Sequence, residues 1–193
     1  MYRVRLLLAW LVLLLIVAVP FAYRAYVSTK YRNLRVVKQG KLYRSGQMSP
    51  AGFERVCREY GIGTVVTLRE QKADGKYDDE EFEQRFCANN KIAFHRFPQC
   101  EWTRTGKHQY CATTLDSFLA ILRDPKTEFP ILIHCFAGIH RTGAHVAMYR
   151  MEVDGWTPQQ AIAELQSMGT VRTKFDNDLL TFLGSYTPQK HQR

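Results

Sequence analysis

This sequence lacks the paired cysteine spacings of disulfide-rich or zinc-binding domains. The chain has five cysteines, an odd number at irregular spacings, and no two form a Cys-x-x-Cys. This pattern argues against a disulfide framework and against a zinc ribbon. We expect all but one to be buried or incidental thiols. The five positions are Cys57, Cys87, Cys100, Cys111 and Cys135.

Acidic residues are also in deficit, with 18 against 27 basic residues and a formal net charge of +9. An excess of positive charge suits nucleic acids, anionic membrane surfaces or phosphorylated substrates. The basic residues are scattered, apart from a cluster beside the N-terminal segment. Because no zinc-finger spacing or RNA-binding aromatic signature accompanies them, a nucleic-acid partner is not expected.

Charge is missing altogether from residues 6–23, between Arg5 and Arg24. As a helix this run reaches about 27 Å at ~1.5 Å per residue, close to the ~30 Å hydrocarbon core of a bilayer. Residues 1–33 are therefore predicted to be an uncleaved, single-pass membrane anchor with its juxtamembrane segment. A cleaved signal peptide is the alternative, although the small-x-small cleavage pattern is not clean around Pro20 and Ala22.

The orientation of this anchor is predicted from the basic residues on its two sides. More of them follow the apolar run than precede it, which favours a cytoplasmic location for the rest of the chain under the positive-inside tendency. A reducing cytoplasm would also keep Cys135 as a thiol. An outward-facing domain is the open alternative. The flanking residues are Arg3 and Arg5 before the run, and Arg24, Lys30, Arg32 and Arg35 after it.

Internal repeats and long linkers are absent, so residues 34–187 are expected to form one domain, with 188–193 as a tail. Strand-like and helix-like segments alternate along it, which predicts an α/β fold with a central, mainly parallel sheet flanked by helices. The most apolar expected strand, 129–135, should lie at the centre. The expected strands are 41–47, 62–70, 91–99 and 129–135. The expected helices are 49–61, 78–90, 108–124, 142–155, 157–169 and 176–186.

Two of these helices carry start signals in the sequence. Ser49 is followed by Pro50, which suits an N-cap and a first helical position. Thr157, Pro158 and Gln160 form a capping-box pattern.

The segment ILIHCFAGIHRTG, residues 131–143, places Cys135 at the end of the apolar strand and Arg141 after five intervening residues. Ligands collect at the carboxyl ends of parallel strands. Consecutive N–H groups before a helix N-terminus form an anion-binding concavity, and the same field favours a thiolate. Arg141 can hold two phosphate oxygens, Gly138 allows close backbone approach, and the Thr142 hydroxyl can donate to the thiolate. The pattern indicates attack by sulfur on phosphorus.

Two other interpretations use the same residues. His134, Cys135 and His140 could be zinc ligands, but no distant cysteine pair completes a tetrahedral set. Cys135 could also be a buried cysteine beside a surface arginine. For the lone histidines His95, His108 and His145, an ordinary surface or core role is expected.

The pattern His134-Cys135-x5-Arg141-Thr142-Gly143 resembles the signature of cysteine-dependent protein tyrosine phosphatases. The short length and the lack of long insertions resemble the dual-specificity branch. The stretch GKLYRSGQMSPAGFERVCREYGIGTVVTLRE, residues 40–70, is similar to the opening of bacterial members and of the atypical plant and fungal group. The resemblance covers roughly Val37 to Leu183.

The resemblance implies a role for each residue of the signature. Cys135 would be the nucleophile and Arg141 the phosphate clamp, while Thr142 would assist departure of the thiolate. His134 would order the loop and tune the thiol. The resemblance implies a phosphocysteine intermediate and neither a metal ion nor a cofactor. Backbone N–H groups would line the phosphate from Phe136, Ala137, Gly138, Ile139, His140 and Arg141.

The general acid of this family does not stand out in the sequence. Such phosphatases usually carry an aspartate on a mobile loop, but residues 99–108, QCEWTRTGKH, contain none. Glu101 is the carboxylate in this segment and is the candidate acid, with an ordinary solvated glutamate as the alternative. Asp116 is a weaker candidate because it falls within an expected helix.

The substrate stays open between several classes. The leading prediction is a phosphatase of phosphotyrosine, with phosphoserine and phosphothreonine as further substrates. The same site could act on inositol phosphates, inositol pyrophosphates or phosphoinositides, and Lys72, Arg104, Lys107 and His108 could add positive charge around it. A catalytically silent phosphate-binding module is the alternative from another class. Sulfur transfer or arsenate reduction would require a resolving thiol such as Cys100 or Cys111.

Overall fold

The computed structural model describes residues 2–69, 78–97, 108–169 and 174–188. The strands are β1 (Arg35–Lys38), β2 (Leu42–Ser45), β3 (Thr64–Thr67), β4 (Ala93–Arg96) and β5 (Ile131–His134). The helices are α1 (Tyr2–Lys30), α2 (Pro50–Glu59), α3 (Asp78–Asn89), α4 (His108–Arg123), α5 (His140–Glu152), α6 (Pro158–Ser167) and α7 (Lys174–Ser185).

The strands form one sheet in the order β1-β2-β5-β3-β4, with β5 at its centre. All neighbouring pairs are parallel except β1 and β2. Every residue of β2, β3 and β5 is buried, because helices cover both faces of these strands. The prediction of a mainly parallel sheet with its most apolar strand at the centre is confirmed.

Strand β1 was not among the predicted strands. It lies at the edge of the sheet, and Val37 is its one buried residue. The segment RVVK therefore has neither an apolar run nor an alternating pattern long enough to be recognised as a strand.

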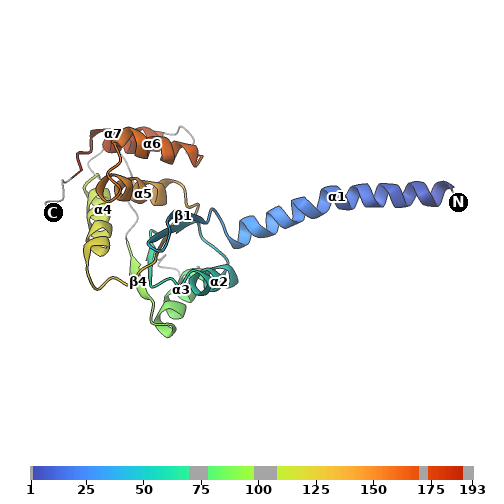
Figure 1. The fold of residues 1–193 in the computed structure, drawn as a ribbon, viewed down its shortest axis with the longest axis horizontal. Helices are drawn as coiled ribbons and strands as arrows, with labels where there is room; N and C mark the ends of the chain where they lie inside the picture. Colours follow the sequence, from blue (N-terminus) through green and yellow to red (C-terminus); the bar gives the residue numbers. More distant parts are fainter. Residues whose placement is uncertain (1, 70–77, 98–107, 170–173, 189–193) are drawn as a thin grey trace.

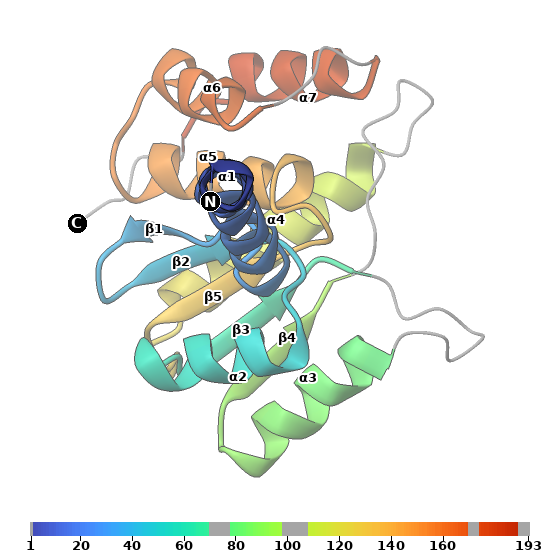
Figure 2. The ribbon, with the colours of Figure 1, turned by 90° about the vertical axis from the view of Figure 1, so that its right-hand side faces the viewer.

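Helices cover the sheet in two layers. Figure 2 shows α2 and α3 on one side of the sheet and α4 and α5 on the other, with α6 and α7 beyond α5. On the first side, Phe53, Val56 and Phe86 pack against Val65 and other sheet residues. On the second side, Phe118, Val146 and Tyr149 pack against residues of β2, β3 and β5.

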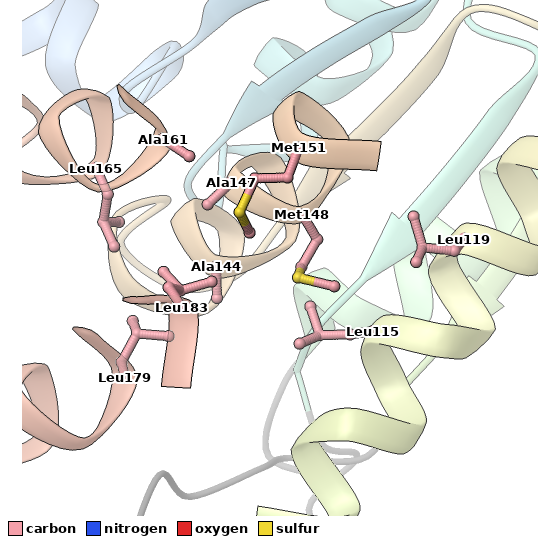
Figure 3. Packing of buried hydrophobic residues seen from close by; sticks show 10 residues of the cluster. All are labelled: Leu115, Leu119, Ala144, Ala147, Met148, Met151, Ala161, Leu165, Leu179 and Leu183. Atoms are coloured by element: carbon pink, nitrogen blue, oxygen red, sulfur yellow. The ribbon is translucent and has the colours of Figure 1, made fainter. Parts of the chain in front are cut away.

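A third apolar cluster joins α5 to the outer helices. Figure 3 shows Met148 and Met151 of α5 among side chains that come from α4, α6 and α7. Because α5 is covered on both sides, the helix that follows the central strand has a fixed position in the core. The cluster consists of Leu115, Leu119, Ala144, Ala147, Met148, Met151, Ala161, Leu165, Leu179 and Leu183.

The predicted helix starts at Ser49 and Thr157 are confirmed. The Ser49 side chain accepts a hydrogen bond from the Gly52 N–H, and Thr157 forms a complete capping box with Gln160. Helices α5 and α7 begin two residues earlier than predicted, at His140 and Lys174.

Helix α1 projects away from the other elements (Figure 1). Its segment Arg5–Arg24 has a mean hydropathy of 2.7 and none of it is buried against the rest of the chain. The helix is long and apolar enough to cross a membrane. Its C-terminal end leads directly to β1 and therefore to the edge of the sheet.

Candidate active site

The predicted nucleophile lies at the carboxyl end of the central strand. Cys135 directly follows β5, and only 5% of its surface is exposed. Residues 135–141 form a loop, here called the phosphate loop, that leads into the first turn of α5. The Gly138 N–H donates a hydrogen bond to Cys135 Sγ at 3.2 Å. An amide donor that points at the sulfur stabilises negative charge there.

Gly138 is required by the shape of this loop. Its φ is +73°, and a Cβ at this position would lie 2.4 Å from the Gly46 nitrogen and 2.5 Å from the Ser45 carbonyl carbon. The strand end of β2 therefore touches the loop backbone to backbone. The Gln47 N–H extends this contact by donating to the Phe136 carbonyl at 2.9 Å.

Arg141, the predicted phosphate clamp, lies in the first turn of α5 and reaches the end of β3. Its Nη1 donates to the Leu68 carbonyl at 2.9 Å. The Leu68 N–H donates in turn to the His134 carbonyl at 2.8 Å. The carboxyl ends of β3 and β5 thus hold the arginine beside the phosphate loop.

Thr142 is fully buried at the start of α5. Among the described residues, its Oγ1 has no hydrogen-bond partner. This hydroxyl is next in sequence to Arg141, and its predicted role in thiolate departure stays a prediction.

His145 is a core residue one helical turn after Arg141. Its Nδ1 lies 2.8 Å from the Arg141 carbonyl oxygen, and since a carbonyl only accepts, Nδ1 must carry the proton. Burial lowers the pKa of His145 from 6.5 to about 4, although the backbone hydrogen bonds partly oppose this shift. The imidazole is therefore neutral at physiological pH, in line with the core role that was expected among the alternatives.

His134, the predicted supporting residue, contacts a carboxylate that the sequence did not reveal. Its Nε2 lies 3.2 Å from Oε2 of Glu83 in α3, and both side chains are almost completely buried. The two atoms are close without being aligned for a hydrogen bond. Gln47 Nε2 donates to the other oxygen of Glu83 at 2.8 Å. Glu83 thus lies between the histidine that precedes the nucleophile and Gln47, which follows β2.

Arg44 was also not predicted as part of the site. It is 2% exposed at the base of the phosphate loop, and its Nη2 donates to the Gly138 carbonyl at 2.7 Å. Burial lowers the pKa of Arg44, while Glu164 and Cys135 act in the opposite direction. A buried cation within electrostatic reach of the sulfur favours an anion in the loop.

An exposed aromatic ring stands at the outer side of the phosphate loop. Phe136 is 56% exposed. The guanidinium of Arg32 lies 4.2 Å from the ring centroid and that of Arg69 lies 5.6 Å from it. Half-buried Arg32 and buried Arg69 therefore both pack against this ring.

The predicted general acid, Glu101, lies outside the described residues, as do Lys72, Arg104 and Lys107, whereas Asp116, the weaker candidate, is exposed on α4.

Cys57 and Cys87 are buried free thiols, and burial raises the pKa of Cys87 to about 12. Within the described ranges, no three His, Cys, Asp or Glu side chains gather in a way that could hold a metal ion.

Comparisons with known proteins agree with this geometry. Residues 20–179 match the family described as "DSP-PTPase phosphatase fused to NAD+ Kinase". The dual specificity protein phosphatase TpbA of Pseudomonas aeruginosa strain UCBPP-PA14 is 45% identical over 53 residues, which are 28% of this chain and 24% of TpbA. The match thus spans about a quarter of the length of this curated relative.

Solved structures share the fold. The core catalytic domain of the PP-IP phosphatase SIW14 from S. cerevisiae, in complex with citrate, aligns with a TM-score of 0.61 at 21% identity, over 82% of this chain and 87% of that one. P. aeruginosa TpbA aligns with a TM-score of 0.60 at 23% identity, over 80% and 85% of the two chains. Because the family model covers most of the chain, and the loop geometry agrees with it, the protein belongs to the DSP-PTPase family of cysteine-dependent phosphatases.

Proposed function

We propose that this protein hydrolyses phosphomonoesters, in the first place phosphotyrosine, through a phosphocysteine intermediate on Cys135. One observation carries the proposal: an amide N–H points at the sulfur of Cys135 in a loop that closes with Arg141 at the start of a helix. This arrangement provides a stabilised nucleophile and a set of donors for a tetrahedral anion.

The reaction has two steps at the same sulfur. The Cys135 thiolate attacks phosphorus, so that an S–P bond forms while the P–O bond to the leaving alcohol breaks. Water then attacks phosphorus, the S–P bond breaks, and inorganic phosphate leaves with regeneration of the thiolate. Arg141 and the loop N–H groups hold the phosphoryl oxygens throughout, because their charge and donors match three anionic oxygens. Thr142 donates to the sulfur as it departs.

The leaving alcohol of the first step requires a proton. Glu101 is the proposed donor, and the same carboxylate would accept a proton from the attacking water in the second step. An aryl oxygen leaves with less help than an alkyl oxygen because it is the weaker base. A phosphotyrosine ester therefore depends less on this proton donor than a phosphoserine or phosphothreonine ester does.

The test of this function uses the full chain in detergent micelles with a phosphotyrosine peptide and phosphate-release detection. The Cys135→Ser variant should show no turnover above the buffer rate but should still bind orthovanadate. Persistent turnover in that variant would exclude Cys135 as the nucleophile. Vanadate binding by the unmodified chain without turnover on any phosphate ester would indicate a silent phosphate-binding module instead.

Inositol phosphates and pyrophosphates are the second candidate substrates. Arg32, half-buried beside Phe136, favours a substrate with more than one anionic group, since its guanidinium can bind a second phosphate. A comparison of inositol pyrophosphate with phosphotyrosine peptide under the same conditions separates the two classes. A higher kcat/KM for the pyrophosphate would assign the chain to the inositol class.

We infer further that α1 anchors the protein in a membrane, with the catalytic domain on the cytoplasmic side. The uncharged run ends at Arg24, and the helix continues only to Lys30 before the chain meets the domain. These six residues span about 9 Å at ~1.5 Å per residue, so the domain would lie close to the membrane surface. Protease accessibility in sealed vesicles tests the orientation. Digestion of the domain from outside intact cells would show that it faces outward.

A further inference from the structure

The carbonyl groups of the phosphate loop point away from the anion site and are held by donors from the N-terminal part of the chain. The Gln47 N–H donates to the Phe136 carbonyl at 2.9 Å. Asn33 Nδ2 donates to the Ala137 carbonyl at 2.8 Å. Arg44 Nη2 donates to the Gly138 carbonyl at 2.7 Å. Three consecutive carbonyl groups of the loop thus accept hydrogen bonds from residues 33–47.

Each of these carbonyl groups shares a trans peptide with an N–H group that points to the opposite side. In a planar trans peptide, the C=O of one residue and the N–H of the next point in opposite directions. A hydrogen bond to the Ala137 carbonyl therefore fixes the direction of the Gly138 N–H. That N–H is the group that donates to Cys135 Sγ at 3.2 Å.

We propose that Asn33 is a positioning residue of the phosphatase reaction. By holding the Ala137 carbonyl, its side-chain amide fixes and polarises the peptide whose N–H stabilises the Cys135 thiolate and the bound phosphoryl group. Arg44 does the same for the next peptide of the loop. The inference rests on the proposed phosphatase function, and it assigns the segment between the apolar helix and β1 to the active site.

The backbone at Asn33 supports this role. Its φ is +50°, a left-handed conformation that asparagine tolerates better than most residues. The neighbouring residue adds two contacts to the same region, since the Arg32 carbonyl accepts from the Gly46 N–H and the Arg32 guanidinium lies over Phe136. The segment is therefore tied both to the end of β2 and to the phosphate loop.

The hydrogen bond is on the surface, which sets the size of the expected effect. Asn33 is exposed, so water competes for the Ala137 carbonyl when the amide is removed. A net loss typical of one hydrogen bond corresponds to a fall of about 5-fold in kcat/KM. An aspartate at this position has no N–H to donate and would face the carbonyl with negative charge, so its effect should be larger.

The experiment compares Asn33→Gly with a matched control in the full chain in detergent micelles. Lys91→Gly is the control, because Lys91 is likewise exposed with a positive φ of +58° but lies in the turn between α3 and β4. Both substitutions place glycine at a position with a left-handed backbone, but only Asn33→Gly removes a hydrogen-bond donor to the phosphate loop. The readouts are kcat/KM on para-nitrophenyl phosphate, the Kd of orthovanadate, the rate of Cys135 alkylation by iodoacetamide at mildly acidic pH, and Tm.

Asn33→Gly should lower kcat/KM about 5-fold, weaken vanadate binding and slow alkylation, with a change in Tm no larger than that of Lys91→Gly. Asn33→Asp should lower kcat/KM, weaken vanadate binding and slow alkylation more than Asn33→Gly does. Values for Asn33→Gly within 2-fold of the control would overturn the proposal, as would a fall in Tm without weaker vanadate binding. If the unmodified chain turns over no phosphate ester, the proposed function fails, and vanadate binding and alkylation still decide the role of Asn33.

Discussion

The substitution Gly138→Ala should displace the phosphate loop and remove most of the activity. A left-handed backbone costs a non-glycine residue roughly 1–2 kcal/mol, and Gly138 has φ +73°. The larger effect is steric, because the new Cβ would lie 2.4 Å from the Gly46 nitrogen, whereas real Cβ contacts stay beyond 3.0 Å. The contact is backbone against backbone, so the loop itself must move by a substantial fraction of an ångström. A misplacement of about 1 Å costs on the order of 100-fold in rate.

Gly155→Ala isolates the steric part of this effect. Gly155 has nearly the same φ, +71°, but an added Cβ there meets nothing within 4 Å. We expect a drop of about 100-fold in kcat/KM on a phosphotyrosine peptide for Gly138→Ala and less than about 2-fold for Gly155→Ala. Orthovanadate binding should weaken only in the first variant. Equal activities of the two variants would refute the conclusion that contact with the end of β2 shapes the loop.

Three further predictions concern a buried histidine, a buried hydrogen bond and the proton donor. His145 has a pKa of about 4 in the folded protein in place of 6.5, so between these pH values the unfolded chain binds more protons. The free energy of unfolding therefore falls as the pH drops from 6.5 to about 4, by about 3 kcal/mol at most. Urea unfolding at neutral and acidic pH should show a smaller loss for His145→Gln. The Tyr186 hydroxyl donates to buried Glu152, so Tyr186→Phe should cost about 1–3 kcal/mol in thermal unfolding at unchanged activity. Glu101→Gln should slow hydrolysis of an alkyl phosphate ~100-fold or more and that of para-nitrophenyl phosphate far less, and equal effects would exclude Glu101 as the acid.

Elements with a strong local signal could be predicted from the sequence. The strand at 131–134 begins with three apolar residues, and helices α2 and α6 begin with capping residues that act on the next few residues only. Strand β1 has no such signal, because three of its four residues are exposed and its pairing with β2 defines it. The signature Cys135-x5-Arg141 could be recognised because both residues belong to one continuous loop.

The supporting residues of the site could not be predicted in this way, since each acts over a long distance in sequence. Arg44 is 94 positions from Gly138, and Asn33 is 104 positions from Ala137. The register of β2 beside β5 pairs Ser45 with His134, which places the residues after both strands against each other. Nothing in the segment YRNLR indicates this contact until the strand order is known.

The arrangement also explains why a chain with an N-terminal apolar helix can position its catalytic loop through the residues that follow this helix. The phosphate loop needs its N–H groups turned inward, so its carbonyls must be satisfied from outside. In this fold β2 is one of the two strands beside the central strand, and Asn33, before β1, and Gln47, after β2, both donate to carbonyls of the loop. Only the short strand β1 separates β2 from the apolar helix α1 along the chain. The segment between α1 and β1 therefore lies close enough to the loop to provide this support. Tyr31 and Leu34, on either side of Asn33, pack against the core cluster beneath the sheet, so the same short segment joins α1 to the core and to the phosphate loop.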